Sequence, residues 1–95
     1  MKIIALEKEN STVSTLAFRK FAKAEAKALW QLYLEGIVRE FYFRKEKKLA
    51  VLVLEVKTKQ AAQKALSKLP FVKYKLIEFE LLPLKPYPGF ERLFT

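Results

Sequence analysis

LSKLPFVKYKLIEFELLPLKPYPGFERLFT, residues 66–95, combines the end of a helix at Leu69-Pro70, a strand over 74–82 and a tail over 83–95. Three prolines in the tail exclude a regular helix or a central strand there. The tail nevertheless carries four large apolar side chains, each contributing about 1.5–3 kcal/mol when buried, namely Tyr87, Phe90, Leu93 and Phe94. Because disordered tails are poor in such residues, we expect this tail to dock on a second copy of the chain.

Hydrophobic periodicity switches cleanly along the rest of the chain. β-Branched and aromatic residues predict strands over 2–9, 37–44 and 49–56, besides the strand over 74–82. A 3.6-residue period predicts helices over 15–35 and 58–69, the first ending at Gly36 and the second at Pro70. The order βαββαβ predicts an α+β fold, a ferredoxin-like sandwich of one domain over residues 1–95, with 83–95 as an oligomer-docking tail.

Two helices cover only one face of a four-stranded sheet, so the alternation of side chains predicts which residues meet them. The set predicted to face the helices is nearly apolar: Ile4, Leu6, Ile37, Phe41, Phe43, Leu52, Leu54, Val56, Ile77, Phe79 and Leu81. The opposite set mixes apolar and ionisable groups: Ile3, Ala5, Glu7, Val38, Glu40, Tyr42, Arg44, Val51, Val53, Glu55, Leu76, Glu78, Glu80 and Leu82. A monomer would expose too much apolar surface on that face. We therefore expect two such faces to stack as a dimeric α/β barrel around a polar cavity, although one bulge would move residues between the sets.

Composition excludes several kinds of chemistry. The chain has neither cysteine nor histidine, which removes disulfides, thiolate sites and histidine as a general base or metal ligand. P-loop, Rossmann and zinc-binding patterns are absent, and we predict no cofactor. Three strand glutamates, Glu7, Glu55 and Glu78, leave an acidic Mg²⁺ or Mn²⁺ site as an alternative to plain salt bridges.

A net charge of +9 raises the question of nucleic-acid binding. The lysines are scattered through every element, which is typical of a solvated surface. RNA-binding sheets of this topology expose aromatic residues on the helix-free face, whereas here that face offers Tyr42 among glutamates that repel phosphate. The longest apolar run, 49–54, is too short to span a bilayer, and the N-terminus opens on a strand pattern rather than a signal peptide. We expect a cytoplasmic protein.

Glu25 lies in the middle of the apolar arc of the first helix. A carboxylate there must be paired, or protonated with a raised pKa, because an unpaired buried charge is very costly. Arg39 and Arg44 on the following strand are the natural partners. Glu25 is then either half of a structural ion pair or a general acid or base in a cleft.

The chain resembles the muconolactone isomerase family over nearly its whole length. The resemblance rests on Lys23-Ala24-Glu25, on the helix ending at Gly36, on Arg44 closing the second strand, on Leu66-Ser67-Lys68-Leu69-Pro70-Phe71-Val72-Lys73-Tyr74, on Ile77-Glu78 and on Pro83-Leu84. It is closer still to short relatives of the isomerase that share the strand pattern Arg-Glu-x-Tyr-Phe-Arg, here 39–44, and the tail Pro-Tyr-Pro-Gly-Phe, here 86–90. Where the family enzymes carry histidines, Phe41 and Tyr87 stand here.

The resemblance implies a homodimeric α+β barrel that assembles further into a ring or decamer-like oligomer. It also implies an isomerase that moves a proton between two carbons of a small anionic lactone. We assign Glu25, Tyr42 and Glu55 as candidate catalytic residues, and Arg39, Arg44 and Glu7 as candidate substrate-binding residues. The alternatives are a non-catalytic ligand-binding or structural oligomer, and a nucleic-acid binder.

Overall fold

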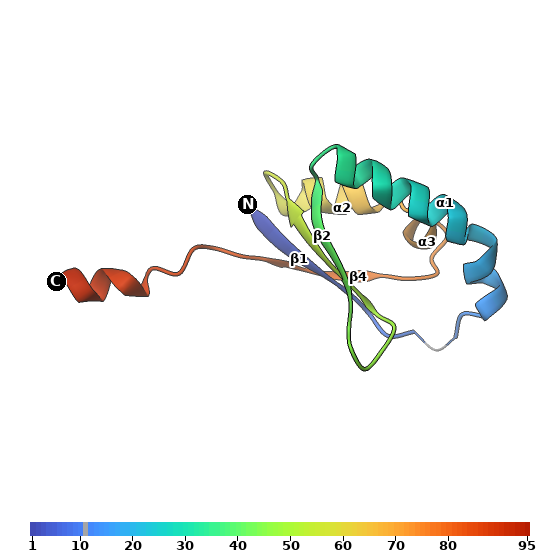
Figure 1. The fold of residues 1–95 in the computed structure, drawn as a ribbon, viewed down its shortest axis with the longest axis horizontal. Helices are drawn as coiled ribbons and strands as arrows, with labels where there is room; N and C mark the ends of the chain where they lie inside the picture. The colour runs from blue at the N-terminus through green and yellow to red at the C-terminus, as the bar shows by residue number, and fades with distance from the viewer. Residues whose placement is uncertain (11) are drawn as a thin grey trace.

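A computed structural model describes residues 1–10 and 12–95. Its elements are β1 (Lys2–Glu7), α1 (Thr15–Leu34), β2 (Val38–Phe43), β3 (Ala50–Glu55), α2 (Lys59–Leu66), α3 (Pro70–Lys73), β4 (Phe79–Pro83) and the 3₁₀ helix η1 (Gly89–Phe94). Helices α1, α2 and α3 lie on one face of an antiparallel sheet with strand order β2-β3-β1-β4 (Figure 1). The predicted α+β, ferredoxin-like sandwich is confirmed, and the sheet of the single chain is open rather than a closed barrel.

Local capping residues set the bounds of α1, and the predicted end at Gly36 is confirmed. The hydroxyl of Ser14 accepts a hydrogen bond from the main-chain N–H of Ala17 at 3.3 Å. At the other end Gly36 has a φ of 75°, and the N–H groups of Gly36 and Ile37 donate to the carbonyls of Tyr33 and Leu32. This is a Schellman motif, in which a left-handed residue ends the helix.

The chain after α2 departs from the prediction. Pro70 begins α3 rather than ending a helix, because proline is well tolerated at the first helical position. A second Schellman motif follows, in which Lys75 takes a φ of 60° and Leu76 donates to the carbonyl of Phe71 at 2.8 Å. Residues 74–78 belong to these turns, so β4 begins at Phe79 and is shorter than the predicted strand over 74–82.

Replacing Lys75 by Gly is expected to raise the free energy of unfolding by about 0.5–1 kcal/mol. The Cβ of an L residue is strained at this left-handed φ, and glycine removes the strain. Urea denaturation followed by circular dichroism measures the change. The matched control is Gly36→Ala, at a φ of 75°, which introduces the same strain and should destabilise. Loss of stability in Lys75→Gly would contradict the left-handed assignment.

The register of β1 corrects the predicted faces of the sheet. Ile3 pairs with Leu54 and Ala5 with Leu52, so Ile3 and Ala5 face the helices and are fully buried. Ile4 and Leu6 instead lie on the helix-free face. Both sets of β1 side chains hold two apolar residues, so alternation alone could not choose between them. One consequence is that Glu7 faces the helices as well.

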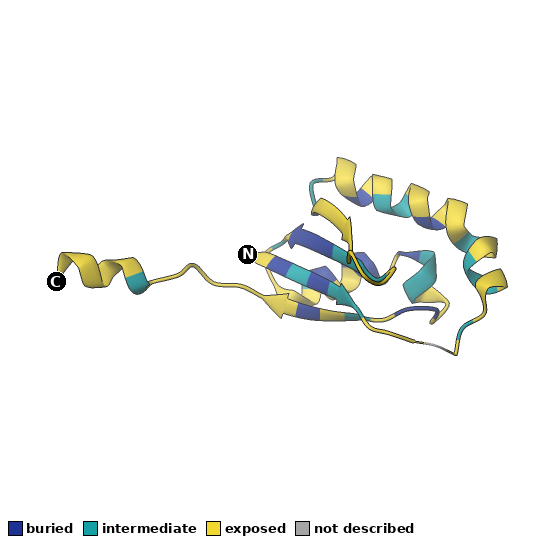
Figure 2. Cartoon of the chain, turned by 60° about the horizontal axis from the view of Figure 1, so that its bottom comes forward, coloured by how far each residue is buried: buried dark blue, intermediate teal, exposed yellow. Residues whose placement is uncertain are grey.

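A bulge at Arg39 causes the second difference from the predicted faces of the sheet. The pairing of β2 with β3 shifts between Val38 and Glu40, which turns Val38 inward, where it is fully buried. Phe41 and Phe43 keep the predicted helix-facing side, as do Leu52, Leu54, Phe79 and Leu81. The buried core runs between this face and the helices (Figure 2). Within the described residues, the helices are too short or too polar to cross a membrane.

Candidate functional site

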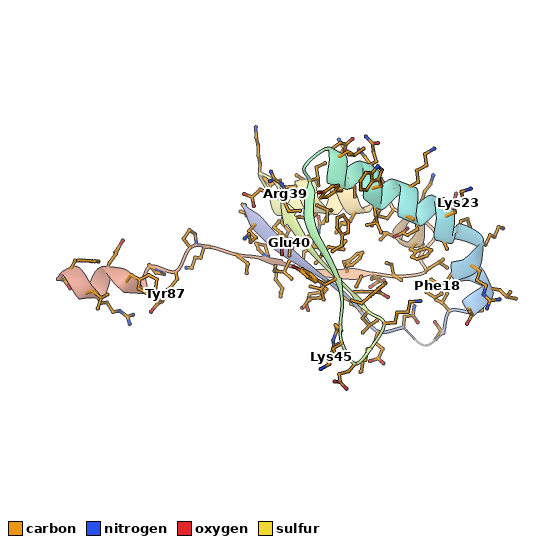
Figure 3. All side chains as sticks on the ribbon, in the orientation of Figure 1. Phe18, Lys23, Arg39, Glu40, Lys45 and Tyr87 are labelled. Carbon is orange, nitrogen blue, oxygen red and sulfur yellow. The ribbon has the colours of Figure 1, made fainter. Side chains whose placement is uncertain are left out.

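A pocket of about 660 Å³ lies between α1 and the helix-facing side of the sheet. Its wall is mostly apolar and includes four ionisable side chains; it is lined by Glu7, Thr15, Phe18, Arg19, Ala22, Glu25, Ala26, Leu29, Phe43, Lys48, Ala50, Leu52, Phe71, Ile77 and Phe79. Phe18 from α1 meets the ring of Phe71 edge-on, with ring centroids 5.2 Å apart. Figure 3 labels Phe18 on α1 and Lys45 in the β2–β3 hairpin. The size suits a small organic ligand.

Glu25 reaches this pocket from the middle of α1 and is 6% exposed. One carboxyl oxygen, Oε1, accepts a hydrogen bond from the main-chain N–H of Phe71 at 2.9 Å. Pro70 has no N–H, so Phe71 carries the first free donor of α3, and Glu25 caps that helix from 46 positions away. Burial raises the pKa of Glu25, the hydrogen bond from Phe71 opposes that rise, and the charge of Glu7 adds to it.

Glu7 shares the pocket because of the β1 register. Its Oε1 accepts a hydrogen bond from the main-chain N–H of Ala50, at the start of β3, at 2.9 Å. Burial raises the pKa of Glu7, and the hydrogen bond from Ala50 lowers it. Two carboxyls of raised pKa therefore face one largely apolar pocket.

Arg19 and Lys48 supply positive charge to the same pocket, and sequence reasoning did not single out either. Arg19 had a signal, since Thr15, Arg19, Ala22, Ala26 and Leu29 follow one helical stripe with Phe18 and Glu25. Lys48 had none, because it belongs to a charged hairpin whose path the periodicity does not define. It also lies over the ring of Phe43, 6.0 Å from the centroid.

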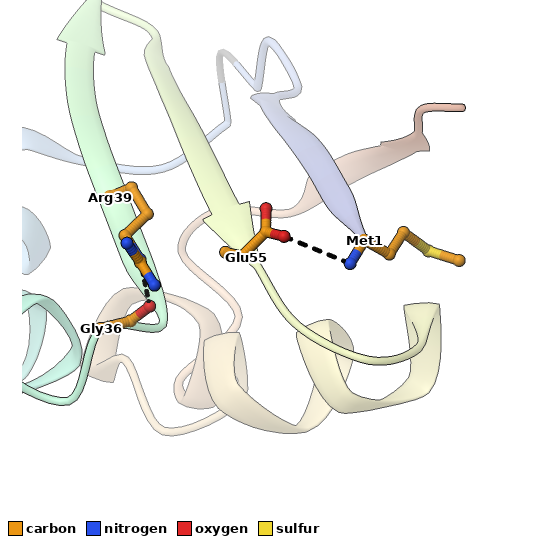
Figure 4. Close-up of polar contacts among 4 residues, drawn as sticks. All are labelled: Met1, Gly36, Arg39 and Glu55. Carbon is orange, nitrogen blue, oxygen red and sulfur yellow. Dashed lines mark hydrogen bonds and ion pairs between the residues drawn. The ribbon is translucent and has the colours of Figure 1, made fainter. Parts of the chain in front are cut away.

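Four of the six predicted site residues do not line this pocket. Tyr42 lies on the helix-free face and donates to Glu40 at 2.6 Å, which raises the pKa of the Tyr42 hydroxyl. Glu55 pairs with the N-terminal ammonium of Met1 at 3.4 Å, and Arg39 donates to the carbonyl of Gly36 at 2.7 Å (Figure 4). Arg44 follows the last residue of β2.

The expected ion pair of Glu25 with Arg39 or Arg44 is wrong. Across residues 1–10 and 12–95, Glu25 forms no salt bridge, and its partner is a main-chain N–H. The bulge in β2 explains the error for Arg39. It leaves the Arg39 side chain at the end of α1, where it donates to the carbonyl of Gly36. No group of three or more acidic side chains able to hold a metal ion occurs among the described residues. Glu78 pairs with Lys8 at 3.6 Å instead.

Comparison with solved structures identifies the fold. The crystal structure of muconolactone isomerase superposes with a TM-score of 0.73 over 94% of this chain and 93% of that chain, at 19% sequence identity. The chain has the fold of muconolactone isomerase. At this identity the likeness extends to the fold and no further. No protein-family model and no curated protein matches the sequence.

On this muconolactone isomerase-like scaffold, the two pocket carboxyls should make stability depend on pH. A raised pKa in the folded state favours the protonated form, so the stabilisation is complete below the ordinary value of 4.5 and is lost as pH rises through the folded pKa. In Glu7→Gln and in Glu25→Gln, the free energy of unfolding should fall less as pH rises than it does in the wild type. Urea denaturation at a series of pH values measures this dependence. Glu46→Gln, in the exposed hairpin, is the control and should keep the wild-type slope. A wild-type slope in both pocket variants would contradict the raised pKa values.

Proposed function

We propose that this protein is an isomerase-like enzyme that moves a proton on a small anionic lactone or enolisable acid. The observation that carries the proposal is the pocket between α1 and the sheet, where Glu25 and Glu7, both of raised pKa, lie with Arg19 and Lys48. A raised pKa brings a carboxyl closer to neutrality, where a general acid or base is most effective.

The pocket residues divide the work as follows. The cations of Arg19 and Lys48 hold the carboxylate of the substrate and stabilise the negative charge that develops on an enolate oxygen. Glu25, ionised, takes a proton from the carbon next to the carbonyl and becomes a carboxylic acid. The same proton returns from Glu25 to a second carbon of the conjugated system, the double bond moves, and Glu25 is again ionised. Tyr42 and Glu55 lie outside the pocket lining and have no role in this proposal.

A non-catalytic ligand-binding protein is the second candidate. One observation favours it: each pocket carboxyl already has an oxygen bonded to a main-chain N–H, from Phe71 and Ala50. Such bonds hold the wall of a pocket in place whether or not chemistry occurs there. The two candidates share the pocket and the anionic ligand, and differ only in proton transfer.

We further propose that the protein is a homodimer formed through the helix-free face of the sheet. That face carries the apolar side chains of Ile4, Leu6 and Val51, with Leu82 39% and Tyr42 55% exposed. Exposed apolar surface of this kind is typical of an interaction site. Stacking two open sheets on these faces gives a barrel-like dimer.

Solvent deuterium tests the proposal. Wild-type protein in D₂O, with muconolactone and a panel of small β,γ-unsaturated acids, is expected to place deuterium on carbon, observed by proton NMR. Binding without deuterium incorporation would favour the non-catalytic candidate and contradict the isomerase.

Lys48→Ala should weaken binding of a small carboxylate about tenfold to a hundredfold, because a hydrogen bond to a charged group contributes about 1.5–3 kcal/mol. Isothermal titration calorimetry measures the change. The control is Lys45→Ala, three positions earlier in the same hairpin and outside the pocket lining. Equal losses in the two variants would mean that net charge, rather than the pocket, attracts the ligand.

A further inference from the structure

The C-terminal segment 84–95, which we name the arm, stands apart from the folded body (Figures 1 and 2). Four of its apolar side chains are largely exposed: Tyr87 63%, Phe90 68%, Leu93 77% and Phe94 85%. The arm also enlarges the molecule. The radius of gyration is 15.5 Å, against about 12 Å for a compact chain of this length.

The first residues of the arm direct it away from the folded body of the same chain. The N–H of Leu84 donates to the carbonyl of Lys2 at 2.9 Å, which continues the β1–β4 pairing beyond Pro83. Pro86 and Pro88 then restrict the backbone, and Tyr87 packs edge-on against Phe90 within the arm, with centroids 5.0 Å apart. The arm therefore leaves these side chains exposed in the single chain, where a second molecule can reach them.

A second group of exposed apolar side chains lies where the last turns of α1 meet the edge strand β2. We name Trp30, Tyr33, Leu34 and Phe41 the aromatic patch; they are 59%, 47%, 60% and 38% exposed. Trp30 stacks on Tyr33 with centroids 5.4 Å apart, and Tyr33 lies 6.0 Å from Phe41. The patch is thus a continuous aromatic surface rather than scattered residues, and such surfaces are typical of protein interfaces.

Charge favours a contact between copies at these two surfaces. The chain carries +9, so two copies repel each other over most of their surface. The arm, however, holds Lys85, Arg92 and Glu91, two bases against one acid, or +1. Segment 26–35 holds Lys27 against Glu35, and segment 38–43 holds Arg39 against Glu40, so both are neutral. Two copies can therefore approach each other at these exposed aromatic surfaces with less charge repulsion than elsewhere.

The sheet places both surfaces at one end of the molecule. Pro83 pairs with Ile3, Ile3 with Leu54, and Leu54 with Val38, which forms one row across the sheet. The arm leaves this row at the β4 edge, while α1 ends beside it at the β2 edge. The two surfaces are thus separated by the width of the sheet within one copy, yet available to a neighbour at the same end.

We propose that the arm of one copy docks on the aromatic patch of a second copy. Aromatic pairs contribute about 0.5–1.5 kcal/mol each beyond their burial. A contact between two different surfaces of the same chain closes when two copies exchange arms, or when a ring of copies forms. This contact is separate from the helix-free face of the sheet and does not depend on the proposed activity.

Sedimentation velocity of two variants and their mixture tests the proposal. Variant one carries Phe90→Glu and Phe94→Glu in the full-length arm; variant two carries Trp30→Glu and Leu34→Glu in the patch. Each is expected to form a smaller assembly than the wild type. Mixed in equal amounts, they should associate again, because variant one retains the patch and variant two retains the arm. Circular dichroism confirms that each variant is folded, and all substituted side chains are exposed.

The control is Leu16→Glu, on the first turn of α1, where Leu16 is 74% exposed outside the patch; its assembly should match the wild type. A monomeric wild type, or a variant one of wild-type mass, would overturn the proposal. If both variants form smaller assemblies but stay separate on mixing, the arm docks elsewhere, and the proposal is equally overturned. A chain ending at Pro83 should behave as variant one does.

Discussion

Replacing Glu25 by Gln is expected to lower turnover of a small enolisable carboxylate by about two to four orders of magnitude. Glutamine keeps the shape of the side chain and can still accept the hydrogen bond from Phe71, but it cannot carry a proton between carbons. Deuterium incorporation under substrate-saturating conditions measures the change in kcat. Because the capping hydrogen bond survives and glutamine carries no buried charge, the free energy of unfolding near neutral pH should not fall.

The control is Glu35→Gln, which changes a glutamate at the exposed C-terminal end of α1 and should leave turnover unchanged. The Michaelis constant of Glu25→Gln should stay close to that of the wild type, since Arg19 and Lys48 hold the substrate carboxylate. Full turnover in Glu25→Gln would remove Glu25 from the chemistry and reduce its role to capping α3.

Replacing Ile3 by Ala is expected to cost about 2–5 kcal/mol of unfolding free energy. Ile3 is fully buried against the helices, so the smaller side chain leaves a cavity in the core. A 95-residue chain has about 5–14 kcal/mol of stability in total, so the loss is a large share of it. Urea denaturation measures the change.

Ile4→Ala is the matched control, because Ile4 is the same residue type on the opposite face of β1. Its cost should be smaller, and should depend on protein concentration if a second copy covers that face, whereas the cost of Ile3→Ala should not. A larger loss in Ile4→Ala than in Ile3→Ala at low protein concentration would contradict the register of β1.

Local signals made much of the fold predictable. Ser14 and Gly36 bound α1 because capping depends only on residues within one turn. The alternation of Leu52 and Leu54 against Val51 and Val53 predicted the faces of β3 because that strand holds no bulge. In both cases the residues that determine the structure lie within a few positions of one another in the chain.

Long-range contacts explain what the sequence did not reveal. The burial of Glu25 followed from the helical stripe, but its partner, the N–H of Phe71, exists only because Pro70 begins α3 at that point. The bulge at Arg39 and the inward turn of Glu7 depend on pairings with β3, and neither leaves a mark in local periodicity. The candidate site was therefore half predictable: its carboxylates were identified, while its cations and its location were not.

The proposed function requires a small anionic ligand to bind in the pocket between α1 and the sheet. Titration of ¹⁵N-labelled protein with muconolactone, followed by the main-chain amide resonances, identifies the surface that the ligand touches. The largest shifts are expected at Phe71 and Ala50, whose N–H groups donate to Glu25 and Glu7, and along segment 18–29 of α1. Shifts confined to Tyr42 and Val51 on the helix-free face, or no shifts at millimolar ligand, would contradict the proposed function.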